Sequence, residues 1–146
     1  MDIKTFLTKE QQDQITGAIA EAEKKTSGEI RVHLEKKCKN SPEKRAIEIF
    51  NQLKMFSTAQ RNGSLIYIAI EDRKFAVIGD KGINEIVPEN FWDSIRDQMI
   101  LNFSKNDYAN GIVEGIKVIG EKLKEHFPYQ TNDKNELTDE ISFNND

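Results

Sequence analysis

The sequence predicts an α/β domain with a small mixed central sheet sandwiched by about four helices. Apolar residues recur with helical spacing in four segments, a continuous apolar run is typical of a buried strand, and a second such run follows after a few polar residues. The chain has 146 residues, 37% hydrophobic and 32% charged, which is enough for one core. We expect one domain over residues 1–128 and an acidic, flexible tail over residues 129–146.

The first helix and first strand are predicted from the change in apolar period. Thr8 and Gln11 have the spacing of a capping box, and apolar residues then recur at helical spacing over Ile15–Ala22. After Gly28, apolar residues alternate with polar ones over Ile30–Leu34, the pattern of a strand with one covered and one wetter face. We therefore place this strand near the side of the sheet.

A second helix is predicted from Ser41 and Pro42, because proline at the first helical position sacrifices no hydrogen bond. The strand–helix–strand order implies a right-handed crossover, so that the strand at Leu65–Ile70 runs parallel to the first one. Its apolar run without alternation indicates burial on both faces. The run Phe75–Ile78 follows as its hairpin partner, which makes the sheet mixed.

Two more helices are predicted towards the C-terminus. One begins at Pro88, and the other follows Asp107 and stops at Phe127 and Pro128. The remaining tail has scattered apolar residues, too few to order it unaided. These are Leu137, Ile141 and Phe143.

Charge and composition exclude several classes of protein. The net charge is −4, and the tail alone accounts for a similar excess, so the body is about neutral and has no basic surface for a phosphate backbone. The longest apolar run, at residues 65–70, is too short to span a membrane, and Met1–Lys4 has no signal-peptide character. We expect a cytoplasmic monomer that binds no nucleic acid and inserts into no membrane.

The chain contains a series of short segments at Arg61–Ile68, Asp72–Phe75, Gly79–Asn84, Val87–Glu89 and Asp107–Gly111. In their order and spacing these segments resemble the TPM family, domains of the thylakoid acid phosphatase and photosystem II maintenance type. The resemblance extends from about Phe6 to Phe127. It implies a sheet covered by helices, with divalent-metal binding and acid-phosphatase activity in some members. Where family members have a Gly-Tyr-Gly-Leu-Glu type segment, this chain has Asp80 and Lys81 for the first two residues and Asn84 for the glutamate.

The predicted topology gathers acidic and amide side chains at one end of the sheet. Antiparallel pairing after the hairpin brings the end of the third strand beside the start of the second, which itself lies beside the start of the first. Carboxylate and amide oxygens suit Ca²⁺ or Mg²⁺, so a weak divalent-ion site is one interpretation, and structural pairing with Arg61 is the other. The candidate ligands are Glu29, Asn62, Asp80, Asn84 and Glu89.

An acid phosphatase is the alternative function. With a bound metal, Arg61 could hold a phosphoryl group bidentately and Asp80 could act as the base. The leading interpretation is a non-catalytic or weakly catalytic domain that binds a divalent cation and serves in protein assembly or maintenance.

Two further hypotheses concern Cys38 and the tail. Cys38 is flanked by lysines, which favour the thiolate, so a thiol-reactive sensor is a third possible function. The tail could dock on a protein partner through its apolar residues.

Overall fold

The structure, a computed structural model, describes residues 2–129 and 137–144 and confirms the predicted fold class. Four strands form one sheet in the order β3-β2-β1-β4. β1 and β2 are parallel, β2 and β3 are antiparallel, and β4 runs parallel to β1. The strands are β1 (Glu29–Glu35), β2 (Gly63–Ala69), β3 (Lys74–Gly79) and β4 (Ser142–Asn144). The helices are η1 (Ile3–Thr5), α1 (Lys9–Glu23), α2 (Pro42–Gln52), α3 (Lys81–Asn84), α4 (Phe91–Phe103) and α5 (Tyr108–His126).

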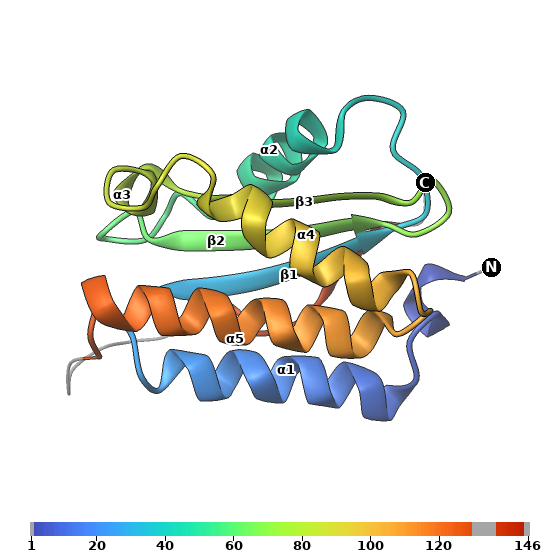
Figure 1. Ribbon diagram of the computed structural model, residues 1–146, viewed down its shortest axis with the longest axis horizontal. Coiled ribbons are helices and arrows are strands. Elements are labelled where there is room, and N and C mark those ends of the chain that lie inside the picture. The colour runs from blue at the N-terminus through green and yellow to red at the C-terminus, as the bar shows by residue number, and fades with distance from the viewer. Residues whose placement is uncertain (1, 130–136, 145–146) are drawn as a thin grey trace.

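The helices cover the two faces of the sheet unequally. α1, α4 and α5 form a layer on one face, whereas α2 lies on the other face over β2 and β3 (Figure 1). Alternate side chains of β1 and β2, such as Ile30 and Ile66, enter the larger core beneath the three helices. Leu65 and Tyr67 point to the smaller core under α2.

Local signals in the sequence explain where the helices begin. Thr8 caps α1 in a complete capping box with Gln11, and the Ser41 hydroxyl accepts from Lys44 N at the start of α2. α4 begins at Phe91, three residues later than Pro88 suggested. The short helix α3 was not predicted.

The expectation that the first strand has a wetter face at the side of the sheet is wrong. All seven residues of β1 are buried, the charged ones included. At the last three of these residues the reason is β4, which pairs alongside β1 and places His33 opposite Ser142. We call residues 137–144 the C-terminal segment.

The expectation of an unordered tail needs the same correction for the part that the structure describes. Ile141 and Phe143 pack against the larger core, and Leu137 packs against the smaller one. Residues 130–136 and 145–146 lie outside the described residues, so the proposed domain boundary at residue 128 stays a prediction.

Candidate functional site

The backbone places several of the predicted site residues at the amino end of the sheet, where β1 and β2 begin and β3 ends. The Glu29 amide donates to the Asn62 carbonyl at 3.2 Å, and the Asp80 amide donates to the Gly63 carbonyl at 2.9 Å. Ser64 lies opposite Gly79 in the antiparallel register, as the hairpin requires. Segments far apart in the sequence therefore meet at this end, as the topology predicted.

Arg61 and Asp80 form a tight ion pair here. Nε and Nη2 of Arg61 donate to the two carboxylate oxygens of Asp80 at 2.7 and 2.9 Å. The Asp80 carboxylate also caps α3 by accepting from the Lys81 amide at 2.7 Å. Both oxygens are thus committed to structural hydrogen bonds, and this pairing raises the pKa of Arg61.

The remaining predicted ligands on this loop have other roles. The Asn84 side chain donates from Nδ2 to the Gly79 carbonyl at 2.9 Å, and its Oδ1 accepts from the Trp92 indole at 2.7 Å. These bonds tie α3 to β3 and α4. Glu89 is exposed just before α4. The structure therefore does not bring Asn84 and Glu89 into one cluster with Glu29.

Asn62 is one of the deeply buried polar residues at this end. It is 1% exposed, and its backbone amide donates to the Thr58 hydroxyl at 3.1 Å. Its side-chain nitrogen lies 3.5 Å from the Ser27 hydroxyl. Its side-chain oxygen has no hydrogen-bond partner within residues 2–129 and 137–144, which leaves a buried acceptor available to a ligand.

Glu29 belongs to a group of carboxyls that the sequence analysis did not assemble. Glu23, at the end of α1, is hydrogen-bonded to Asp139 of the C-terminal segment and interacts with the charge of Glu29. Burial and the hydrogen bond to Asp139 raise the pKa of Glu23 to about 10, so that it carries a proton at neutral pH. Glu23 Oε2 also accepts from the Ile30 amide at 3.0 Å.

These carboxyls are not a preformed metal centre. Among the residues that the structure describes, no group of three or more His, Cys, Asp or Glu side chains is arranged to hold a metal ion. A cation here would need amide or backbone oxygens as further ligands.

The opposite end of the sheet has a buried polar network that the sequence analysis missed. The Glu35 carboxylate, at the end of β1, accepts two hydrogen bonds of 2.9 Å from Arg45 of α2 and a third from the Tyr67 hydroxyl. His33 Nε2 lies 3.3 Å from Glu35 Oε1, and its Nδ1 lies 2.8 Å from the Ser142 hydroxyl. The hydroxyl of Tyr67, within the otherwise apolar run Leu65–Ile70, is the signal that could have indicated a polar partner there.

Electrostatics in this network follow from its hydrogen bonds. Burial alone would raise the pKa of Glu35, but hydrogen bonds from His33, Arg45 and Tyr67 outweigh it and lower the pKa to about 2. Burial and the bond to Glu35 raise the pKa of Tyr67. The network therefore holds Glu35 ionised and Tyr67 protonated. Its hydrogen bonds join β1, β2 and α2, so we assign it a structural role.

A cavity of about 250 Å³ lies beside this polar network, at the carboxyl ends of the parallel strands. Cys38 is among its lining residues but is 2% exposed, and its thiol donates to the Asn40 carbonyl at 3.2 Å. The backbone amide of Cys38 donates to the Asp72 carboxylate at 2.7 Å. Its surroundings are those of a packed cysteine.

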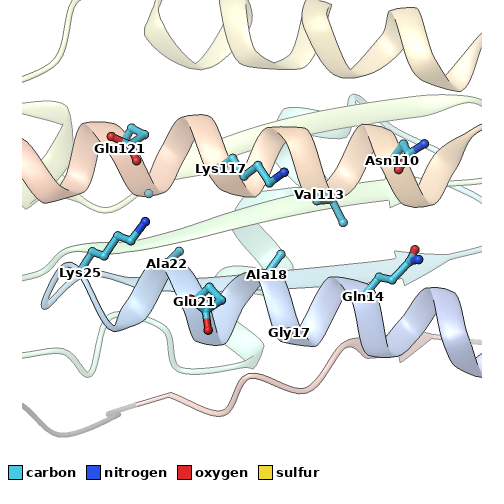
Figure 2. Close-up of a pocket in the computed structure, with 11 residues that line it drawn as sticks. Gln14, Gly17, Ala18, Glu21, Ala22, Lys25, Asn110, Val113, Lys117 and Glu121 are labelled. Atoms are coloured by element: carbon cyan, nitrogen blue, oxygen red, sulfur yellow. The ribbon is translucent and has the colours of Figure 1, made fainter.

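A groove of about 650 Å³ runs between α1 and α5 on the outer side of the helical layer. Small residues line its floor, and Gln14, Glu21, Lys25 and Lys117 stand along its sides (Figure 2). The groove mixes both signs of charge, so it has no evident preference for a charged ligand.

Together, the sheet order, the parallel β1–β2 crossover and the helical layers define a small open-sheet α/β domain. The TPM domain family model matches residues 1–122, and the chain belongs to this family. No significant match is found among curated proteins. Within the described residues, no helix is long and apolar enough to cross a membrane.

Solved structures support the same fold. The BA42 protein of the psychrophilic bacterium Bizionia argentinensis is 45% identical, with a TM-score of 0.90 over 97% of this chain and 98% of that one. The N-terminal domain of a P. gingivalis protein is 20% identical, with a TM-score of 0.70 over 88% and 84% of the two chains. The N-terminal domain of cg2496 from Corynebacterium glutamicum is 14% identical, with a TM-score of 0.65 over 81% and 74%.

Proposed function

We propose that this TPM-family chain is a non-catalytic domain that binds a divalent cation, Ca²⁺ or Mg²⁺, and serves in protein assembly or maintenance. The observation that supports cation binding is the group of carboxyls at the amino end of the sheet. Glu23, Glu29 and Asp139 come from three separate segments, and one of them holds a proton in the absence of a cation. The assembly or maintenance role rests on family membership.

Physical chemistry explains why such a group favours a cation. Buried carboxyls close together cannot all ionise, so they share protons or take up a positive ion. Oxygen ligands suit Ca²⁺ and Mg²⁺, and the buried side-chain oxygen of Asn62 lies at the same end of the sheet. Because the ligands are not preformed, we expect weak binding, with a Kd on the order of 10⁻⁴ to 10⁻³ M.

The cation is tested by titrating the full chain with Ca²⁺ and with Mg²⁺ while backbone amide shifts are followed by NMR. Saturable shifts are expected near Glu23, at Glu29–Arg31, around Asn62 and near Asp139. Glu23→Gln and Asp139→Asn should each weaken binding by about tenfold. Glu89→Gln is the matched control, because this carboxyl is exposed and should leave the affinity unchanged.

The pH dependence gives a second readout. Since a cation must displace the proton on Glu23, the affinity should rise as the pH rises. If the titration gives no saturable shift at either metal, or if Glu89→Gln abolishes binding while Glu23→Gln does not, the proposed site is wrong.

The acid-phosphatase alternative requires Asp80 to act as a base and Arg61 to hold phosphate. The ion pair between them favours a structural role, because Arg61 and the Lys81 amide already donate to the Asp80 carboxylate. We therefore expect wild type and Asp80→Ala to show the same background with a phosphomonoester. Hydrolysis by wild type that Asp80→Ala loses, with the variant still folded, would favour the alternative.

A further inference from the structure

One side of β1 pairs with β2, and the other side is covered by a short strand from the far end of the chain and by Glu23, whose carboxylate accepts from the Ile30 amide. β4 pairs with β1 over three residues, from His33 opposite Ser142 to Glu35 opposite Asn144. The TPM match ends at residue 122, so this cover lies outside the matched domain. Without β4, the backbone groups of β1 at residues 33–35 would be an open strand edge.

Side chains of β1 are matched to the C-terminal segment. Arg31 is 9% exposed, and its guanidinium donates to the Glu140 carbonyl at 3.3 Å. The Arg31 Nε has no hydrogen-bond partner in the part of the chain that the structure describes. Loss of water lowers the pKa of Arg31 while the charge of Glu140 opposes the shift, so this buried cation depends on an acidic neighbour.

A second polar contact and two apolar ones fix the register. His33 Nδ1 lies 2.8 Å from the Ser142 hydroxyl, and Ile141 and Phe143 pack against the larger core. An acidic residue followed by apolar, polar and apolar residues is therefore the pattern that this surface accepts.

The C-terminal segment fills its site incompletely. β4 is half-buried along its whole length. A cavity of about 250 Å³ remains between α1 and the segment, lined by Gln12, Asp13 and Thr16 on one side and by Glu140, Ile141 and Phe143 on the other. Few pairing residues and a partly filled site place this segment among the parts of the molecule that open most easily.

We infer that the side of β1 is a strand-acceptor surface, and that a second copy of this chain can supply the C-terminal segment in place of the chain's own. Arg31 contacts the Glu140 backbone carbonyl of this segment and His33 contacts its Ser142 side chain, and strand addition needs the same backbone pairing from either source. Exchange of an identical element between copies is a low-cost route to a dimer. In dilute solution each copy closes on itself, because the tethered segment has the higher effective concentration.

The direct test supplies the segment as a peptide. The full-length variant I141D/F143D keeps the acceptor surface but loses the apolar contacts of its own segment. A synthetic peptide of residues 137–144 should bind this variant at least tenfold more tightly than it binds wild type, whose site is filled. Amide shifts should concentrate at residues 31–35 and 12–16.

Matched controls separate strand addition from non-specific binding. The same peptide with both apolar residues changed to aspartate should not bind. Leu101→Asp, which adds a charge at an exposed apolar position on α4, should leave the peptide affinity at the wild-type value. If folded I141D/F143D fails to bind the peptide, the acceptor surface is refuted.

Two measurements test the inference further. In wild type, native-state hydrogen exchange at residues 142–144 should be at least about 100-fold faster than at residues 65–68, and equal rates at both would overturn local opening. This comparison also decides the question if I141D/F143D does not fold. Labelled I141D/F143D should associate with wild type at roughly millimolar concentration, and failure to associate there would exclude a second copy as the occupant.

Discussion

Arg45 of α2 donates two parallel hydrogen bonds of 2.9 Å to Glu35 of β1, from Nε and Nη2 to the two carboxylate oxygens. The Glu35 side chain is 2% exposed and that of Arg45 is 21% exposed, so water screens this ion pair poorly. The pair joins helix α2 to the end of strand β1, which directly precedes this helix in the chain. Breaking it would leave a buried carboxylate whose remaining partners, among the residues that the structure describes, are His33 and Tyr67.

We expect Arg45→Ala to lower the free energy of unfolding by about 3 kcal/mol, because it leaves a buried charge without its cation. Urea denaturation at pH 7 measures this loss. The control is Arg96→Ala, whose partners Glu43, Asp93 and Asp97 are all on the surface, and which should cost less than about 1 kcal/mol.

The same loss should depend on pH. The pKa of Glu35 is lowered from 4.5 to about 2 in the folded chain, so its contribution is present above pH 4.5 and disappears as the pH falls through 2. The difference between wild type and Arg45→Ala should therefore shrink towards pH 2. A difference that stays constant down to this pH would contradict the role given to the ionised carboxylate.

Glu23 should make the stability depend on pH in the opposite direction. Its pKa is raised from 4.5 to about 10 on folding, so between these values the folded chain holds a proton that the unfolded chain has lost. Stability from this group is then lost as the pH rises through the window. In chelator-containing buffer, Glu23→Gln should be more stable than wild type at pH 8 by about 1–3 kcal/mol and equal to it near pH 4.5.

Glu21→Gln is the control for this profile, since Glu21 lies two residues earlier on α1, is exposed and pairs with Lys24. It should leave the pH profile of stability unchanged between pH 5 and pH 9, because the bond to Lys24 lowers the pKa of Glu21 and places its titration below this window. A wild-type curve that runs parallel to that of Glu23→Gln from pH 5 to pH 9 would show that Glu23 is ionised throughout.

The fold followed from the sequence because each local signal agreed with the topology. The capping box at Thr8, the proline at position 42 and the unbroken apolar run of β2 each predicted an element that the structure contains. β4 could not be predicted in this way. Its three residues carry no period of their own, and they are ordered by backbone pairing with β1.

The candidate site was predicted only in its backbone placement. Topology brought Glu29, Asn62 and Asp80 to one end of the sheet, but side-chain partners depend on orientation, which spacing does not reveal. In the structure, the Asp80 side chain pairs with Arg61 and does not form part of a ligand group with Glu29 and Asn62. The grouping of Glu23 with Asp139 was hidden because it depends on the unpredicted docking of the C-terminal segment.

Burial of Cys38 predicts slow chemistry at the thiol. At 2% exposure, with its thiol bonded to the Asn40 carbonyl, it should react with iodoacetamide at least about 100-fold more slowly in native buffer than in urea. Mass spectrometry over time measures both rates. Fast alkylation of the folded chain below the ordinary titration range of a thiol would instead favour the sensor hypothesis.

Two glycines give opposite predictions for the same substitution. A methyl group at Gly17, on the floor of the α1–α5 groove, would meet nothing within 4 Å (Figure 2). Because glycine costs helix stability through the entropy of the unfolded chain, Gly17→Ala should stabilise the domain by about 0.5–1 kcal/mol.

At Gly82, in contrast, the methyl carbon would lie 2.3 Å from the Gln60 carbonyl oxygen and 2.7 Å from that of Arg61. These are backbone atoms, which cannot rotate away, and the Gly82 amide also donates to Arg61 O at 3.0 Å. Gly82→Ala should therefore cost about 1–3 kcal/mol in urea denaturation. A loss of stability at Gly17 as well would mean that the groove is closed in solution, because only a neighbour in contact could turn a favourable helix substitution into an unfavourable one.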